Sequence, residues 1–227
     1  MVVKFDFLRI LSLFVLISVL GVSFGASIRR IKTRQELEQN VKKFNEWYNK
    51  STNNSKNPFF MKVVSNDDLA IFTNRDLLSN EEIYTFDKSI CLSAELIYAL
   101  PYEKLIRELE EKYGYDELTY LVIVLIHEYY NPESKYREYL DILPTNPGSP
   151  IFNYWENSKS VDPELMHTSV LRKLVDFKIQ IERRSRGLVN GLFSQHAELF
   201  NPEYFTEDNV EWALFMIDTR VKYVGDR

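Results

Sequence analysis

The chain has 227 residues, of which 45% are hydrophobic and 27% are charged, and its formal net charge is −5. This length suits one domain or slightly more, and the apolar content, with few glycines and prolines, excludes an intrinsically disordered chain. The acidic balance argues against a general nucleic-acid binder, so we expect no nucleic-acid partner. A single cysteine, Cys91, excludes an internal disulfide.

Residues 1–25 predict a signal peptide rather than part of the fold. Lys4 and Arg9 give a short basic start, and residues 10–22 are an apolar run, short for a membrane span. Small residues precede Ala26, so we expect cleavage there and no stable membrane span afterwards. The prediction is a secreted protein or one in the endomembrane lumen, and an uncleaved anchor is the alternative.

Residues 26–58 predict an amphipathic helix followed by a polar linker. Thr33 to Glu36 read Thr-Arg-Gln-Glu, which is a capping box at a helix start. The apolar face that follows consists of Leu37, Val41, Phe44 and Tyr48. We expect this helix to end near Trp47, and residues 51–58 are rich in turn-forming residues. Asn-x-Ser triplets begin at Asn49 and at Asn53, and they match the pattern of glycosylation acceptors.

Residues 59–92 predict a small antiparallel sheet. Short runs of β-branched and aromatic residues suggest strands near 60–64, 69–73 and 82–86, the last after a turn at Ser79-Asn80.

Residues 93–227 read as helices. We expect helices at 94–100 and 102–113, and then a central helix that begins at Asp116 and stops at Asn131-Pro132. This central helix is apolar all round, which indicates burial on every side. A shorter helix at 134–143 should turn Tyr136, Tyr139 and Leu140 inward.

A long helix is expected to start at Asp162-Pro163. Its apolar stripe consists of Val170, Leu174, Phe177, Ile181, Ser185 and Leu188. We interpret Arg183, Arg184 and Arg186 as a solvated face. Thr206 should cap the last helix, whose expected buried residues are Trp212, Phe215, Met216 and Thr219.

Three segments in this order resemble the SET-domain methyltransferases of the class that includes the Rubisco lysine methyltransferase and the actin-histidine methyltransferase. Leu69–Leu92 is similar to the family's opening hairpin. Tyr136–Phe152, with its Leu-Pro, resembles a second signature, and Phe205–Arg220 resembles the family's Trp-Ala helix that ends in Ser/Thr-Arg. The fold class predicted is α+β: a small antiparallel β unit at about 59–92, followed by a large all-α insert lobe, in a truncated SET-like fold.

The resemblance implies S-adenosylmethionine (AdoMet) as cofactor and a lysine or histidine side chain of a protein as substrate, with the helical lobe facing the protein partner. Carried over residue by residue, the cofactor-binding positions are Asp67, Asp68, Leu69, Ala70 and Arg220. The family's Gly-x-Gly is Asp68-Leu69-Ala70 here. Its Asn-His motif and catalytic tyrosine follow the segment that is matched, so we expect no catalytic residue in this chain.

Other chemistries have little support in the sequence. His127 follows a buried run and is predicted to be structural, and Cys91 is predicted to be a buried thiol rather than a nucleophile. His167 and His196 lack neighbours at metal-ligand spacing, so we expect no metal site. The glycine patterns of hydrolases and of nucleotide-binding proteins are absent.

Two hypotheses therefore remain. One is a SET-type protein methyltransferase that is truncated and inactive on its own. The other is a helical protein-binding module of the secretory pathway, a pseudoenzyme without cofactor.

Overall fold

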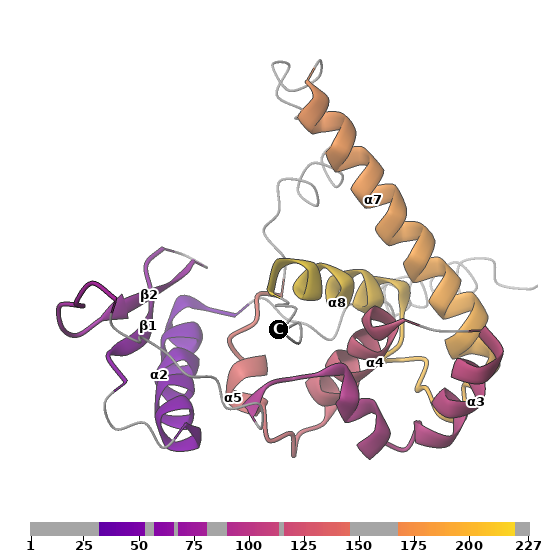
Figure 1. Ribbon diagram of the computed structural model, residues 1–227, viewed down its shortest axis with the longest axis horizontal. Coiled ribbons are helices and arrows are strands. Elements are labelled where there is room, and N and C mark those ends of the chain that lie inside the picture. The colour runs from indigo at the N-terminus through magenta and orange to yellow at the C-terminus, as the bar shows by residue number, and fades with distance from the viewer. Residues whose placement is uncertain are drawn as a thin grey trace, which may run out of the picture. The chain divides into compact units, whose positions relative to one another are not determined.

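The computed structural model describes residues 32–52, 57–65, 68–80, 90–113, 116–145 and 168–220, and Ile31–Arg227 form one compact unit. Helices dominate, and the sheet among the described residues has two antiparallel strands. Figure 1 shows the hairpin beside the first helix and the remaining helices beyond it. The predicted α+β class, with a small β unit before a helical part, is confirmed.

The first helix, α2 (Arg34–Ser51), begins at the predicted capping box. The backbone N–H of Glu36 donates to the Thr33 hydroxyl at 3.2 Å, and the Thr33 N–H donates to the Glu36 carboxylate at 2.9 Å. Leu37 and Val41 are buried, as the apolar face predicts. The helix continues about one turn beyond Trp47, because Thr52 caps its end with a bond to the Tyr48 carbonyl.

Strands β1 (Phe59–Val63) and β2 (Leu69–Thr73) form an antiparallel hairpin with Met61 opposite Ile71. On one face, Met61, Val63 and Leu69 pack on a small cluster made of Leu37, Val41 and Ile142. The first two predicted strands are confirmed, and the third, at 82–86, lies outside the described residues.

The other hairpin face is also apolar. The rings of Phe60 and Phe72 stack at 6.0 Å, and the Lys62 ammonium lies 4.8 Å from the Phe60 ring centre. Ile71 lies opposite Met61, on the face that carries the small cluster, yet it is 68% exposed, and Leu78, which follows β2 in the chain, is 76% exposed. A two-stranded hairpin that is apolar on both faces covers little of its own surface.

Helix α4 (Glu117–Tyr130) is the centre of the main core, as its all-round apolar sequence predicts. It packs against η2 (Ala94–Ala99), α5 (Arg137–Leu140) and α8 (Glu207–Arg220). The residues of α4 from Val122 to Ile126 are all buried. The short η2 is a 3₁₀-helix, and α3 (Glu103–Tyr113) follows it in the chain.

Both ends of α4 are held by side chains. At its start, the Asp116 carboxylate accepts from the Thr119 N–H at 3.0 Å and also pairs with Arg184. At its end, the Arg137 guanidinium donates to the carbonyls of Glu128, Tyr129 and Asn131 at 2.8, 2.9 and 2.7 Å. The bonds from Arg137 fix the corner between α4 and α5.

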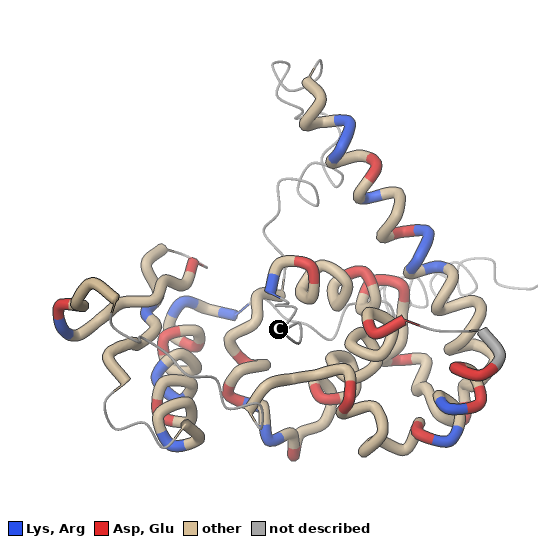
Figure 2. The backbone as a smooth tube through the Cα atoms, in the orientation of Figure 1, with Lys and Arg blue, Asp and Glu red and all other residues tan. Residues whose placement is uncertain are grey.

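The long helix α7 (Ser169–Gly187) begins later than predicted. Thr168 is its N-cap, with backbone dihedrals of an extended residue, and its hydroxyl accepts from the Leu171 N–H at 3.3 Å. Asp162 and Pro163 lie outside the described residues. The apolar stripe is buried only from Ile181 onward, and Val170 is 54% exposed. Basic and acidic residues are interspersed along this helix (Figure 2).

After Gly187 the chain continues as a π-helical stretch, η3 (Leu188–Phe193). Helix α8 then follows the Thr206 cap, where the Asn209 N–H donates to the Thr206 hydroxyl at 3.2 Å. Its residues from Asn209 to Ile217 are buried except for Glu211, which is half-buried. Thr219, expected to be buried, is exposed, because the helix leaves the core in its last turn.

The ranges with described structure contain no helix with the length and apolarity that crossing a membrane requires.

Candidate functional site

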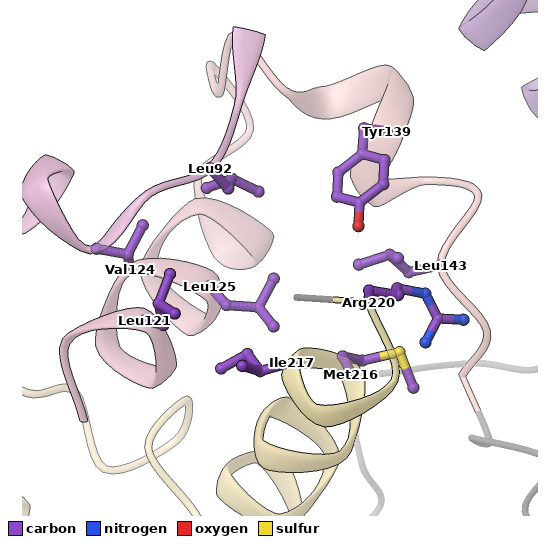
Figure 3. A pocket seen from close by; sticks show the side chains of 9 residues that line it. All are labelled: Leu92, Leu121, Val124, Leu125, Tyr139, Leu143, Met216, Ile217 and Arg220. Atoms are coloured by element: carbon purple, nitrogen blue, oxygen red, sulfur yellow. The ribbon is translucent and has the colours of Figure 1, made fainter. Parts of the chain in front are cut away.

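A cavity of about 90 Å³ lies where α4, α5 and the end of α8 meet (Figure 3). Its wall is mainly apolar and includes Leu121, Val124, Leu125, Leu143, Met216 and Ile217. Two polar side chains complete the lining, Tyr139 and Arg220. The cavity therefore combines an apolar wall with the Arg220 guanidinium and the Tyr139 phenol.

Arg220 is the last residue of α8 and brings a positive charge to this cavity. Its guanidinium donates to the Thr219 hydroxyl at 2.5 Å, and within the described ranges it forms no ion pair with a carboxylate. Burial of part of the side chain lowers the pKa of Arg220, an effect that Tyr139 opposes, but a guanidinium stays charged in proteins. The predicted cofactor arginine is thus a cation at the cavity that has no carboxylate partner among the described residues.

Tyr139 comes from the short helix α5 and lies at the same cavity. Its hydroxyl points toward the Arg220 side of the cavity (Figure 3). Burial raises the pKa of Tyr139, and the charge of Arg220 opposes this in part. The phenol therefore keeps its proton at neutral pH and can donate a hydrogen bond.

The hairpin residues predicted to bind a cofactor lie at the start of β2. The Asp68 carboxylate accepts from the Ser65 hydroxyl at 2.5 Å, and its carbonyl accepts from the Val64 N–H at 2.9 Å. Leu69 packs against the small cluster under the hairpin, and Ala70 is half-buried opposite Lys62. Asp67 lies outside the described residues.

Tyr139 links these two groups in the structure. Tyr139 packs on the cluster that holds Leu69, and it also lines the cavity with Arg220. The sequence reasoning placed Tyr139 in the core but missed it as a site residue. The Tyr-Leu…Leu-Pro signature that contains it was the available signal.

The other candidate groups do not form a site among the described residues. The Tyr102 hydroxyl and the His127 Nδ1 are 2.9 Å apart, and burial lowers the pKa of His127, a setting in keeping with the predicted structural role. Cys91 is half-buried rather than buried. Arg184 is not part of a solvated face, because it pairs with Asp116. No cluster of three metal-binding side chains occurs in the described part of the chain.

This arrangement, a small hairpin followed by a helical part whose last helix ends in Thr-Arg, is the fold of the SET-domain protein methyltransferases over part of their length. The resemblance predicted from the sequence is confirmed by two comparisons, while no family model matches the chain. The structure of Rubisco LSMT bound to AdoMet has a TM-score of 0.63 to this chain at 23% identity, and the match covers 78% of this chain. The SET domain of LSMT bound to lysine and AdoHcy gives a TM-score of 0.61 at 22% identity over 79% of this chain.

Among proteins of known activity, the chain is similar to the [fructose-bisphosphate aldolase]-lysine N-methyltransferase of the Arabidopsis thaliana chloroplast. The two are 25% identical over 185 residues, which is 82% of this chain and 36% of that protein. The chain also spans 39% and 38% of the two solved structures. It therefore corresponds to less than half of the proteins that it resembles.

Proposed function

We propose that this protein is part of an AdoMet-dependent protein methyltransferase of the SET type, acting on a lysine or histidine side chain. The observation that carries the proposal is the position of Arg220. It ends α8 beside the cavity, where the resemblance expects the arginine that contacts the cofactor. Without a carboxylate partner in the described ranges, it is a cation suited to an anionic ligand group.

The residues at the cavity fit one end of AdoMet. Arg220 would hold the carboxylate of its amino-acid part, and the apolar wall from α4 and α8 would keep water from the aliphatic chain. When bound, AdoMet supplies a methyl group on a positively charged sulfur. The start of β2, from Asp68 to Ala70, would supply backbone contacts, although the side chains at 68 and 70 limit how closely a ligand approaches.

Methyl transfer needs more than these contacts. The acceptor nitrogen must be neutral, in line with the transferred methyl and at near-attack distance. In the family that this chain resembles, the Asn-His motif and the catalytic tyrosine follow the matched segment. We therefore propose that the described residues bind cofactor but do not complete the transfer by themselves.

Calorimetric titration with AdoMet tests the cofactor proposal. Wild-type protein should bind, and Arg220→Met should bind about 10- to 100-fold more weakly, because a hydrogen bond to a charged group is lost. Arg220→Lys should fall between the two, since it keeps the charge without the fork of donors. Arg34→Met is the matched control, because Arg34 forms an exposed ion pair with Glu38 in α2 and should leave affinity unchanged.

The absence of any AdoMet binding by the wild-type chain would overturn the proposal and favour a helical protein-binding module. Equal affinity of wild type and Arg220→Met would remove the observation on which the proposal rests.

We also propose that the helical part contacts the protein substrate. Along α7, Val170 is 54% exposed and Ile179 is 42% exposed, among charges of both signs. In a protein that shows methyltransferase activity, Val170→Asp and Ile179→Asp should weaken methylation of the protein substrate. Both variants should leave AdoMet affinity unchanged. Unchanged methylation by both variants would contradict this role.

Entry into the secretory pathway remains a proposal that rests on residues 1–25, which lie outside the described structure. N-terminal sequencing of the protein from its native cells should find Ala26 or a neighbouring residue first. An intact Met1, or a start far from Ala26, would contradict it.

A further inference from the structure

Tyr139 occupies a singular position in the described structure. It is the one side chain there that packs against both apolar clusters, the main core around α4 and the small cluster under the hairpin. Its ring centre lies 6.4 Å from that of Phe44 in α2. Contacts from several elements therefore fix the direction of its hydroxyl.

Within the described ranges the Tyr139 hydroxyl forms no hydrogen bond, although the Tyr139 ring packs against both clusters. It points into the cavity toward Arg220, whose guanidinium also lacks an anionic partner there (Figure 3). The Tyr139 side chain is half-buried and its hydroxyl faces the cavity, so a ligand that enters the cavity can accept a hydrogen bond from it. Both residues line one small cavity, and a carboxylate bound there could accept from both, because a carboxylate can accept several hydrogen bonds.

We propose that Tyr139 is a ligand-binding residue whose hydroxyl donates to the same carboxylate that Arg220 holds. The inference rests on the proposed function, since that carboxylate is the amino-acid end of AdoMet. It adds a residue from α5 to a site otherwise formed by α8 and the start of β2.

This role explains why the short helix α5 is so firmly placed. Arg137 ties it to the end of α4 through three carbonyls, and Leu140 is fully buried. A donor that must meet a ligand oxygen benefits from a support that holds its position before the ligand arrives. Burial also keeps the Tyr139 phenol protonated, so it donates across the neutral pH range.

The test compares ligands with and without the carboxylate. Calorimetric titrations would use AdoMet and decarboxylated AdoMet on the wild-type chain and on Tyr139→Phe. AdoMet should bind Tyr139→Phe about tenfold more weakly, as for one hydrogen bond to a charged group. Decarboxylated AdoMet should bind both proteins equally, because it lacks the group that the hydroxyl contacts.

Tyr98→Phe is the matched control. The Tyr98 hydroxyl donates to Glu110 at 2.6 Å and does not line the cavity, so this variant should bind AdoMet as the wild type does. A double variant, Tyr139→Phe with Arg220→Met, should lose less than the product of the two single losses, because both donors serve one carboxylate. Thermal unfolding of each variant shows whether the fold is retained.

The outcomes separate the two proposals. If the wild-type chain does not bind AdoMet, the proposed function fails and this inference fails with it. If the wild type binds AdoMet and folded Tyr139→Phe binds it with equal affinity, the proposed function stands and the inference is overturned. An equal loss for AdoMet and decarboxylated AdoMet would also overturn it, since Tyr139 would then act through packing.

Discussion

Removing the Arg137 guanidinium should destabilise the protein more than removing any exposed arginine. Its three bonds to the carbonyls of Glu128, Tyr129 and Asn131 satisfy groups that the end of α4 leaves unpaired. The positive charge also lies at the helix end that favours a cation. One hydrogen bond to a charged group contributes about 1.5–3 kcal/mol, but bonds to one donor group are not additive and the side chain is 29% exposed.

We therefore expect Arg137→Met to lower the free energy of unfolding by about 3 kcal/mol. For a domain of this size, about 2–4 °C of melting temperature accompanies each kcal/mol, so the fall should be roughly 6–12 °C. All three bonds come from the single Nη2 nitrogen, so Arg137→Lys keeps a charged donor for these carbonyls but loses the Nη1 contact with Asp141, and it should lose about half as much.

Urea unfolding followed by circular dichroism, together with scanning calorimetry, measures both changes. Arg34→Met is the control, because its ion pair with Glu38 is more than half exposed and such pairs contribute about 0.2–1 kcal/mol. If Arg137→Met melted within about 2 °C of this control, the clamp would contribute no more than a surface ion pair, and the reasoning would be refuted.

Three further predictions concern other contacts. Asp116→Ala should lower the free energy of unfolding by about 1–2 kcal/mol, because the helix cap is lost. Asp116→Asn still caps the helix and should lower it by roughly 0.5 kcal/mol. Equal losses for the two variants in urea unfolding would contradict the capping role. The half-buried His127 has a lowered pKa in the fold, so the stability that is full above its unfolded pKa, about 6.5, should decline as the pH falls below that value. His127→Gln should flatten this part of the pH profile, and an unchanged slope would count against it. Trp212→Phe should cost about 2–3 kcal/mol, because the indole is 2% exposed and donates to the Pro144 carbonyl at 2.9 Å; a smaller loss than in Arg34→Met would contradict this.

Features with local causes were predicted well from the sequence. The capping box at Thr33, the N-cap at Asp116 and the stop at Asn131-Pro132 depend on neighbours within a few residues, and the structure has all three. The first two strands were also predicted, because short runs of β-branched and aromatic residues mark them locally. Burial of α4 followed from its composition alone.

Features that depend on distant partners were not predicted. The partner of Arg184 is 68 residues away, so a run of three arginines suggested solvent where there is an ion pair. The start of α7 at Ser169 was missed although its cause is local, because the Asp162-Pro163 pair is a stronger start signal in the sequence than the Thr168 cap. Of the candidate site, Arg220 came from a resemblance, whereas the position of Tyr139 between two clusters required the packed structure.

The hairpin has a practical consequence for anyone who purifies this chain. Phe72 is partly and Ile71 largely open to water, on opposite faces of β2, and among the described residues no further strand pairs with the outer edge of β2. Such edges template pairing with other molecules, and one lysine, Lys62, offers little charge to prevent it. Concentrated solutions should therefore gel or precipitate sooner than the net charge suggests, and a single Ile71→Lys exchange should raise the attainable concentration.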